Sequence, residues 1–260
     1  MKFCVITAGE ILPDFAALSA AIAAAFTLDR DTAAIRTRHG WGILDTDLEE
    51  TAANALVGKC AGFGVKTLKL PAEALKALPG VLPLKQIGLE PGRFTWTGGA
   101  ARTGSDWTDV LALSAAPIKV ATTHLVKTTE GPSIQERAIR LGIMAVGLPV
   151  GFGKTREVNK EITGSDLVFY LDILLKTDKL RLRLDPANFD FSCLKEKKTY
   201  SSQTNFRVLC AELSAHAPGA LRNTGLRAIL EGKPLSALPY DSLEDLEKET
   251  RRLAALSYKP

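Results

Sequence analysis

The chain has 260 residues, enough for one large domain or for two domains of ordinary size, each with its own hydrophobic core. Apolar residues make up 46% of the sequence and charged residues 24%, a composition that excludes wholesale disorder. The formal charge of +4 at pH 7 is too small to require nucleic acid or an anionic membrane as the partner.

The first seventy residues alternate between the hydrophobic periods of strands and of helices. Apolar residues alternate at the start, and an alanine-rich helix with apolar residues at helical spacing follows. The pattern predicts six elements in the order β-α-α-β-α-β: a strand at 1–9, helices at 15–26 and 27–40, a strand at 41–45, a helix at 49–63 and a strand at 65–70.

This order of elements resembles the C-terminal domain of the bacterial ribosomal stalk protein. The short second helix after Thr27-Leu28 and the ending KCAGFGVKTLKL, residues 59–70, are part of the resemblance, which covers Met1–Leu70. The adaptor that delivers substrates to the Clp protease has the same fold, so the resemblance implies a domain that binds other proteins. Leu28-Asp29-Arg30-Asp31 stands where the stalk protein has its glycine- and lysine-rich contact signature, so binding of translation factors is not implied.

Beyond Pro79-Gly80, which we take as a domain boundary, the sequence changes to short strand-like runs separated by turn residues. Leu180, Leu182 and Leu184 should face a core, with Arg181 and Arg183 on the outward face. Residues 133–165 show no clear pattern. The predicted elements are strands at 84–90, 93–96, 107–113, 118–127, 167–175 and 180–184, and helices at 202–216, 223–230 and 243–256, the last of them opened by a capping box at Asp241-x-x-Glu244.

This second part of the sequence resembles a pleckstrin-homology-like domain. The resemblance rests on strands at short intervals, the step Trp107-Thr108-Asp109-Val110 and the closing helix at Ser202–His216. Such a domain is a bent antiparallel sandwich that is closed at one end by a C-terminal helix. We therefore expect an α+β fold with a stalk-protein-like βααβαβ domain at 1–76. A mainly antiparallel β-sandwich or barrel of pleckstrin-homology-like type should follow at 80–232, and a charged C-terminal helix at 233–260.

Several motifs suggest chemistry, and for each we favour a structural role. Gly151–Thr155 looks like the end of a phosphate-binding loop, but Leu148 occupies the position of the first glycine. Aspartate pairs precede predicted helices, which they would cap, and the histidines have no spacing that makes a metal pair on one helix. These residues are Asp29/Asp31, Asp45/Asp47, His39, His124 and His216. We predict no catalytic residue, no metal ligand and no cofactor.

Aromatic residues and cysteines fit the core better than a binding surface. Phe94, Trp96 and Trp107 lie on predicted sandwich strands, where such side chains are usually buried. They are not interleaved with basic residues, as binding of single-stranded nucleic acid would require, so we expect no nucleic-acid partner. The four cysteines show no metal-type pairing and are expected to be reduced, buried thiols.

Basic residues on one strand and the loop after it form the one candidate binding site. If the strand and the loop are neighbours, these side chains can converge on a phosphate or an acidic partner; the alternative is a solvated strand face. The residues are Lys179, Arg181, Arg183, Lys195, Lys197 and Lys198.

Together these features predict a cytoplasmic, non-enzymatic adaptor or interaction protein that binds another protein. The N-terminal residues begin directly as a strand and lack the layout of a signal peptide. Two alternatives stay open. One is an enzyme or ligand-binding protein with a site at the domain interface, near residues 133–165. The other is peripheral association with anionic membrane lipid through the basic strand face and Ile139–Phe152.

Overall fold

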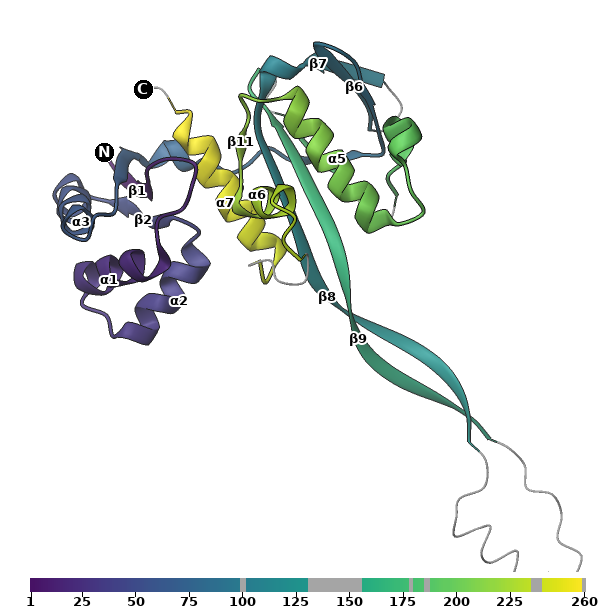
Figure 1. Cartoon of the computed structure of the whole chain (residues 1–260). Coiled ribbons are helices and arrows are strands. Elements are labelled where there is room, and N and C mark those ends of the chain that lie inside the picture. The colour runs from purple at the N-terminus through teal and green to yellow at the C-terminus, as the bar shows by residue number, and fades with distance from the viewer. Residues whose placement is uncertain (99–101, 131–155, 178–179, 185–187, 235–239, 259–260) are drawn as a thin grey trace, which may run out of the picture. The chain divides into compact units, whose positions relative to one another are not determined.

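A computed structural model describes residues 1–98, 102–130, 156–177, 180–184, 188–234 and 240–258 (Figure 1). The fold class is α+β, as predicted. The chain divides into two compact units, one formed by Met1–Ile118 with Leu167–Pro260 and the other by Lys119–Asp166. The first unit contains parts of all three predicted domains, and the boundaries at 76–80 and 232–233 stay predictions.

The N-terminal elements follow the predicted order β-α-α-β-α-β. They form a three-stranded sheet in the order β2-β1-β3 with both pairs antiparallel. Asp29 caps the second helix, because its carboxylate accepts hydrogen bonds from the backbone N–H groups of Asp31 and Thr32. The elements are β1 (Phe3–Thr7), α1 (Phe15–Phe26), α2 (Arg30–Gly40), β2 (Ile43–Leu48), α3 (Glu50–Gly62) and β3 (Thr67–Pro71).

Strand β1 is buried on both faces, since successive side chains of a strand point to opposite sides of the sheet. Val5 belongs to the core that α1, α2 and α3 form on one face. Cys4 and Ile6 pack on the other face with Leu75 and with Ala255 of the C-terminal helix α7 (Leu243–Leu256). The last helix of the chain therefore completes the core of the first sheet, and α7 lies beside that sheet in Figure 1.

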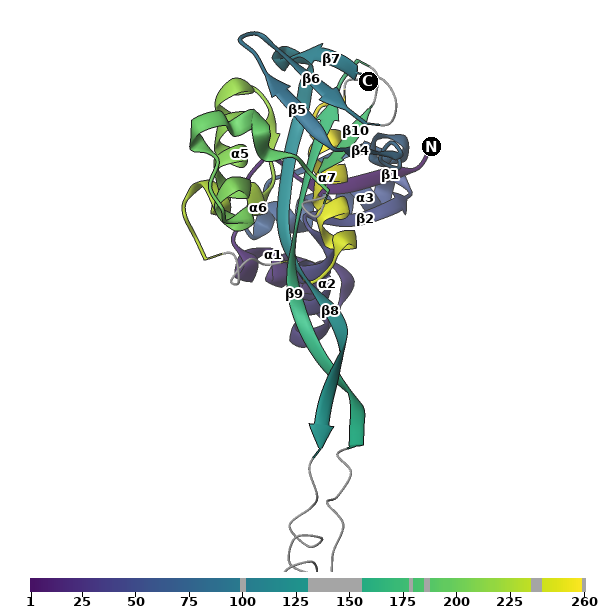
Figure 2. The same cartoon turned by 90° about the vertical axis from the view of Figure 1, so that its right-hand side faces the viewer.

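The rest of the chain forms two further sheets, one of five strands in the order β11-β8-β9-β10-β4 and a small one in the order β5-β6-β7, which Figure 2 shows as a separate layer. β4 with β10 and β11 with β8 are parallel pairs, whereas β9–β10, β5–β6 and β6–β7 are antiparallel. The elements are η1 (Ala72–Leu75), β4 (Val81–Leu84), β5 (Gln86–Leu89), β6 (Arg93–Thr97), β7 (Arg102–Asp106), η2 (Trp107–Asp109), β8 (Val110–Glu130), β9 (Arg156–Leu175), β10 (Arg181–Leu184), η3 (Phe191–Lys197), α5 (Ser202–His216), β11 (Leu221–Arg222) and α6 (Thr224–Leu230).

Several predicted boundaries are wrong. The strand predicted at 84–90 is divided between β4 and β5, and the strand predicted at 167–175 begins at Arg156. Residues 107–109 form a 3₁₀ turn instead of the start of a strand, because the Trp107 indole N–H donates to the Glu90 carbonyl and holds the turn. Strand β8 runs on through the predicted gap at 114–117. The C-terminal helix is capped by Ser242, whose Oγ accepts from the Asp245 N–H, and not by Asp241.

The main core confirms the predicted leucine face. Leu182 and Leu184 are fully buried, and Leu180 packs against the same core. Phe94, Trp96 and Trp107 are also buried there, as predicted from their strand positions. Within the described part of the chain, no helix has the length and apolar character needed to cross a bilayer.

Candidate functional site

Arg181 and Arg183 are buried, which corrects the prediction that they face solvent. They are 4% and 9% exposed. Both guanidinium groups contact the carboxylate of Asp172 on β9, at 2.7 Å each, and both reach Glu247 on α7. Burial disfavours the charge of Arg183, but the hydrogen bonds and charges of Asp172 and Glu247 outweigh it and raise its pKa. The predicted basic strand face is thus an internal ion-pair cluster beneath α7.

The predicted lysines do not form one patch with these arginines. Lys179 lies outside the described residues. Lys197 Nζ lies 2.6 Å from Glu212 Oε1, and Lys198 Nζ lies 3.8 Å from Asp190 Oδ1. The side chain of Lys195 makes no hydrogen bond or ion pair with any residue that the structure describes. Among the described residues of the predicted set, its ammonium group is therefore the available cation.

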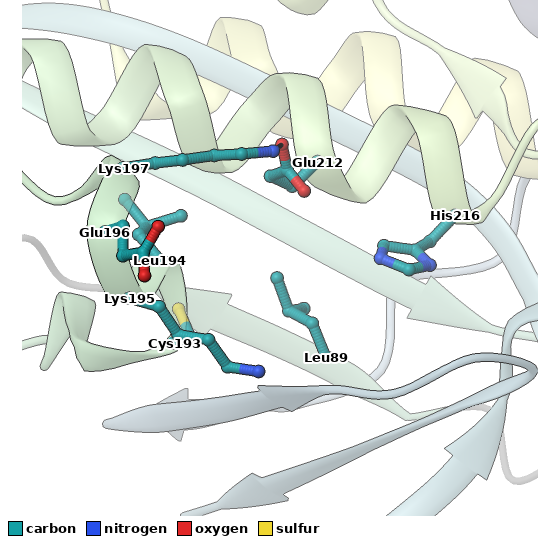
Figure 3. A pocket seen from close by; sticks show the side chains of 8 residues that line it. All are labelled: Leu89, Cys193, Leu194, Lys195, Glu196, Lys197, Glu212 and His216. Atoms are coloured by element: carbon teal, nitrogen blue, oxygen red, sulfur yellow. Dashed lines mark hydrogen bonds and ion pairs between the residues drawn. The ribbon is translucent and has the colours of Figure 1, made fainter.

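Lys195 and Lys197 line an open cavity of about 400 Å³ between η3 and α5, which we call the η3–α5 cavity. Figure 3 shows Lys195 reaching toward this space from η3, while the ring of His216 enters from the end of α5. The apolar side chains of Leu89 and Leu194 also line it. The remaining residues of its wall are Cys193, Glu196 and Glu212.

Two side chains of the η3–α5 cavity, His216 and Cys193, determine what chemistry it can support. The His216 ring stacks on Trp107, with ring centroids 4.8 Å apart and planes 13° apart, so its position is fixed. Burial raises the pKa of the Cys193 thiol to about 11. Because the thiolate is the nucleophile, Cys193 is not a nucleophile at neutral pH. Covalent chemistry through this thiol is therefore not expected at neutral pH.

A second, more apolar cavity lies where α1 begins and α2 ends. Its volume is about 460 Å³, and we call it the α1–α2 groove. Trp41 in its wall stacks on Tyr240 with centroids 4.4 Å apart. Gly42 has φ +80°, and a Cβ there would come within 2.5 Å of Thr7 Oγ1, so glycine is required for this turn. The groove is lined by Leu12, Pro13, Phe15, Leu18, Thr37, Arg38, Trp41, Gly42 and Thr224.

Of the aspartate motifs, Asp29 and Asp45 have structural roles. Besides Asp29 at its helix cap, Asp45 pairs with Arg36 at 2.9 Å. Asp47 does not cap a helix as predicted but lies in β2, with φ +58°.

Of the histidines, His39 lies near two carboxylates, and its Nδ1 is 3.8 Å from Asp245 Oδ1. The other carboxylate, Asp241, already pairs with Arg38, and Asp245 accepts the Asp241 N–H, so we assign no metal to this group. Gly151–Thr155 and the side chain of His124 lie outside the described residues.

A buried polar cluster between α6 and α7 was not predicted. The Tyr240 hydroxyl donates to Glu249 and accepts from Asn223 Nδ2 at 2.7 Å. Burial first, and then the Glu249 carboxylate, raise the Tyr240 pKa, so the phenol stays protonated. Arg252 donates to the carbonyl groups of Gly9 and Glu10 at 2.8 and 2.9 Å. These bonds join α7 to the loop after β1, and no short motif in the sequence marks them.

The sequence matches no family model, and comparisons with curated proteins and with solved structures find no significant similarity. The resemblances to the stalk-protein domain and to the pleckstrin-homology domain therefore stay predictions.

Proposed function

We propose that this protein is a non-enzymatic interaction protein that binds a segment of another protein in the α1–α2 groove. The observation that carries the proposal is the groove itself, which is mainly apolar and open at the surface. Phe15 at its edge is 50% exposed. An exposed apolar surface of this kind, rimmed by polar groups, is typical of a site that another protein covers.

The distribution of exposed apolar side chains supports the same region. Of the ten large apolar residues that are exposed in the described part of the chain, six lie in the first 70 residues. Ile11 precedes the groove residues Leu12 and Pro13, and Ile35 is one helical turn from the groove residue Arg38. These side chains would extend the apolar contact beyond the groove itself.

The charge of α2 defines the class of partner. The helix carries Arg30, Arg36 and Arg38 against a single acidic residue, Asp31. Arg36 is already paired with Asp45, so Arg30 and Arg38 are the cations that a partner can reach. Arg38 pairs with Asp241 at 3.0 Å, but both side chains are more than half exposed, so the pair contributes little and is easily exchanged. We therefore propose that the partner segment is amphipathic and acidic, with apolar side chains for the groove and carboxylates for α2.

The two alternatives have less support. Membrane association was based on a basic strand face and on Ile139–Phe152. The two arginines of that face are buried beneath α7, and Ile139–Phe152 lies outside the described residues. An enzyme or ligand-binding site at the domain interface, near residues 133–165, lies largely outside the described residues, which resume at Arg156 in β9, and no observation on the described part favours it.

Affinity capture with point variants tests the proposal. The tagged full-length chain would be captured from its own cell lysate as wild type, Phe15→Glu and Tyr200→Glu, followed by mass spectrometry of intact complexes. Phe15 is the first residue of α1, where a glutamate suits the helix dipole, so the variant should fold. Tyr200 is a fully exposed control outside the groove.

We expect a stoichiometric protein partner with the wild type and with Tyr200→Glu, and its loss with Phe15→Glu. Binding of the same partner at equal levels by all three proteins would refute the assignment of the groove. Capture of a metabolite without any protein would refute the interaction function.

A further inference from the structure

We infer that the η3–α5 cavity binds a small-molecule carboxylate that has an apolar body. This site is separate from the α1–α2 groove, and the inference does not depend on the proposed function. It joins an unpaired cation, an apolar wall and a fixed imidazole in one cavity (Figure 3).

The cation is Lys195, and its backbone conformation is the first argument. Lys195 has φ 51° and ψ −123°, a conformation that side-chain-bearing residues rarely adopt. The carbonyl of this residue accepts the Lys198 N–H at 3.1 Å, which closes the turn around it. Such strain is found preferentially at ligand sites, where it positions a side chain. Here it directs the ammonium group toward the cavity, with no partner among the described residues.

The wall of the η3–α5 cavity supplies the other groups that would contact the ligand. Leu89 and Leu194 offer apolar surface, and the ring of His216, held by its stack on Trp107, offers a nitrogen donor. A volume of about 400 Å³ is within the range of small-ligand pockets. A carboxylate between the lysine and the imidazole, with its hydrocarbon part against the leucines, satisfies all of these groups.

The balance of charge favours one carboxylate over a phosphate. Glu212 is offset by Lys197, which leaves Lys195 as the unpaired cation. Glu196 also lines the cavity and has no partner among the described residues, so it would repel a dianion. Phosphate sites usually gather several cations or backbone N–H groups around one anion. A monoanion with an apolar body therefore fits this lining better.

The histidine ring provides a direct test by NMR. The full-length protein would be titrated with butyrate and with benzoate, each matched by its neutral amide, while the ring signals of its three histidines are followed. Lys195→Gln removes the proposed cation. Lys198→Gln removes a charge from the same loop but outside the cavity lining, and serves as the matched control.

We expect a saturable shift of the His216 signals by at least one carboxylate, with a Kd below about 10 mM, and no shift by the amides. Lys195→Gln should weaken this binding by about tenfold or more, whereas Lys198→Gln should leave it unchanged. His39 signals should not move. A lack of saturation with both acids, or equal binding by Lys195→Gln, would overturn the inference.

Discussion

Arg181 and Arg183 share the carboxylate of Asp172 in the interior, and Glu247 adds a second, partly exposed carboxylate. A buried ion cluster of this kind adds little net stability when it is complete, because each charge has lost its hydration. Removal of one member is costly, since it leaves the remaining charges buried and unpaired.

Asp172→Ala should therefore lower the free energy of unfolding by about 3–5 kcal/mol, because it leaves two buried guanidinium groups with only Glu247. Urea denaturation would measure the change. Lys248→Ala is the control, because it breaks a surface pair with Glu244 on the same helix as Glu247 and should change stability by about 0.5 kcal/mol or less. Equal effects of the two substitutions would contradict the burial of the cluster.

Lys195 differs from Asp172, because its replacement by glycine should stabilise the protein. Because its φ is positive, Lys195→Gly should relieve strain and raise the free energy of unfolding by about 1 kcal/mol. Lys195→Gln keeps the strained backbone and should have no such effect. Thermal melts of the two variants measure the difference, and a glycine variant less stable than the wild type would show that the conformation is not strained.

At the scale of single elements, two helical glycines have opposite roles. Gly225 in α6 approaches the main sheet so closely that an added Cβ would lie 2.1 Å from the Ala115 carbonyl oxygen. Gly58 in α3 has open space around its Cα. Helix propensity favours alanine over glycine at both positions, so only the packing distinguishes them.

We expect Gly58→Ala to stabilise the protein by about 0.5–1 kcal/mol. Gly225→Ala should destabilise it by about 1–3 kcal/mol, because overpacking against backbone outweighs propensity. Chemical denaturation of both variants provides the comparison. If both were stabilised, α6 would not pack on the sheet through this glycine.

Helix α7 gives the protein a defined response to acid. Burial of Glu247 works against its ionisation, but hydrogen bonds and charges from Arg181 and Arg183 are stronger and lower its pKa. A lowered pKa in the folded state contributes stability above the ordinary glutamate value of about 4.3, and this contribution disappears as the pH falls through the folded pKa.

The Tm should therefore fall as the pH drops below about 5, and Glu247→Gln should show a smaller fall from a lower starting Tm. Part of the fall should remain in the variant, since hydrogen bonds from Thr32 and Ser192 lower the pKa of Asp29 and Asp190. Melting curves across this pH range test the prediction. An unchanged pH dependence in Glu247→Gln would show that the ion pairs do not hold this carboxylate.

At the scale of the whole molecule, the C-terminal helix connects parts that are distant in sequence. Its Arg252 bonds to the loop after β1, its Glu247 covers the arginines of β10, and its Ala255 packs under β1. Deletion of residues 1–70 would expose the apolar face of this helix. Point variants are therefore the better way to study binding by the N-terminal elements.

The contacts of α7 with distant parts of the chain also explain which features could be predicted from the sequence and which could not. Local patterns were sufficient for the βααβαβ order, for the buried leucines of β10 and for the helix cap at Asp29, because each depends on neighbouring residues. The burial of Arg183 depends on Glu247, which is 64 residues further along the chain. Of the predicted binding residues, Lys195 and Lys197 line a cavity, whereas the α1–α2 groove is formed by segments that no motif connects.

Photo-crosslinking in living cells tests the central proposal most directly. A photoreactive phenylalanine analogue would replace Phe15 at the groove or, as the control, Tyr200. After irradiation, we expect one discrete adduct with another protein at position 15 and none at position 200, and the crosslinked partner peptide should be acidic and amphipathic. The absence of an adduct at position 15, or identical adducts at both positions, would contradict a partner-binding α1–α2 groove.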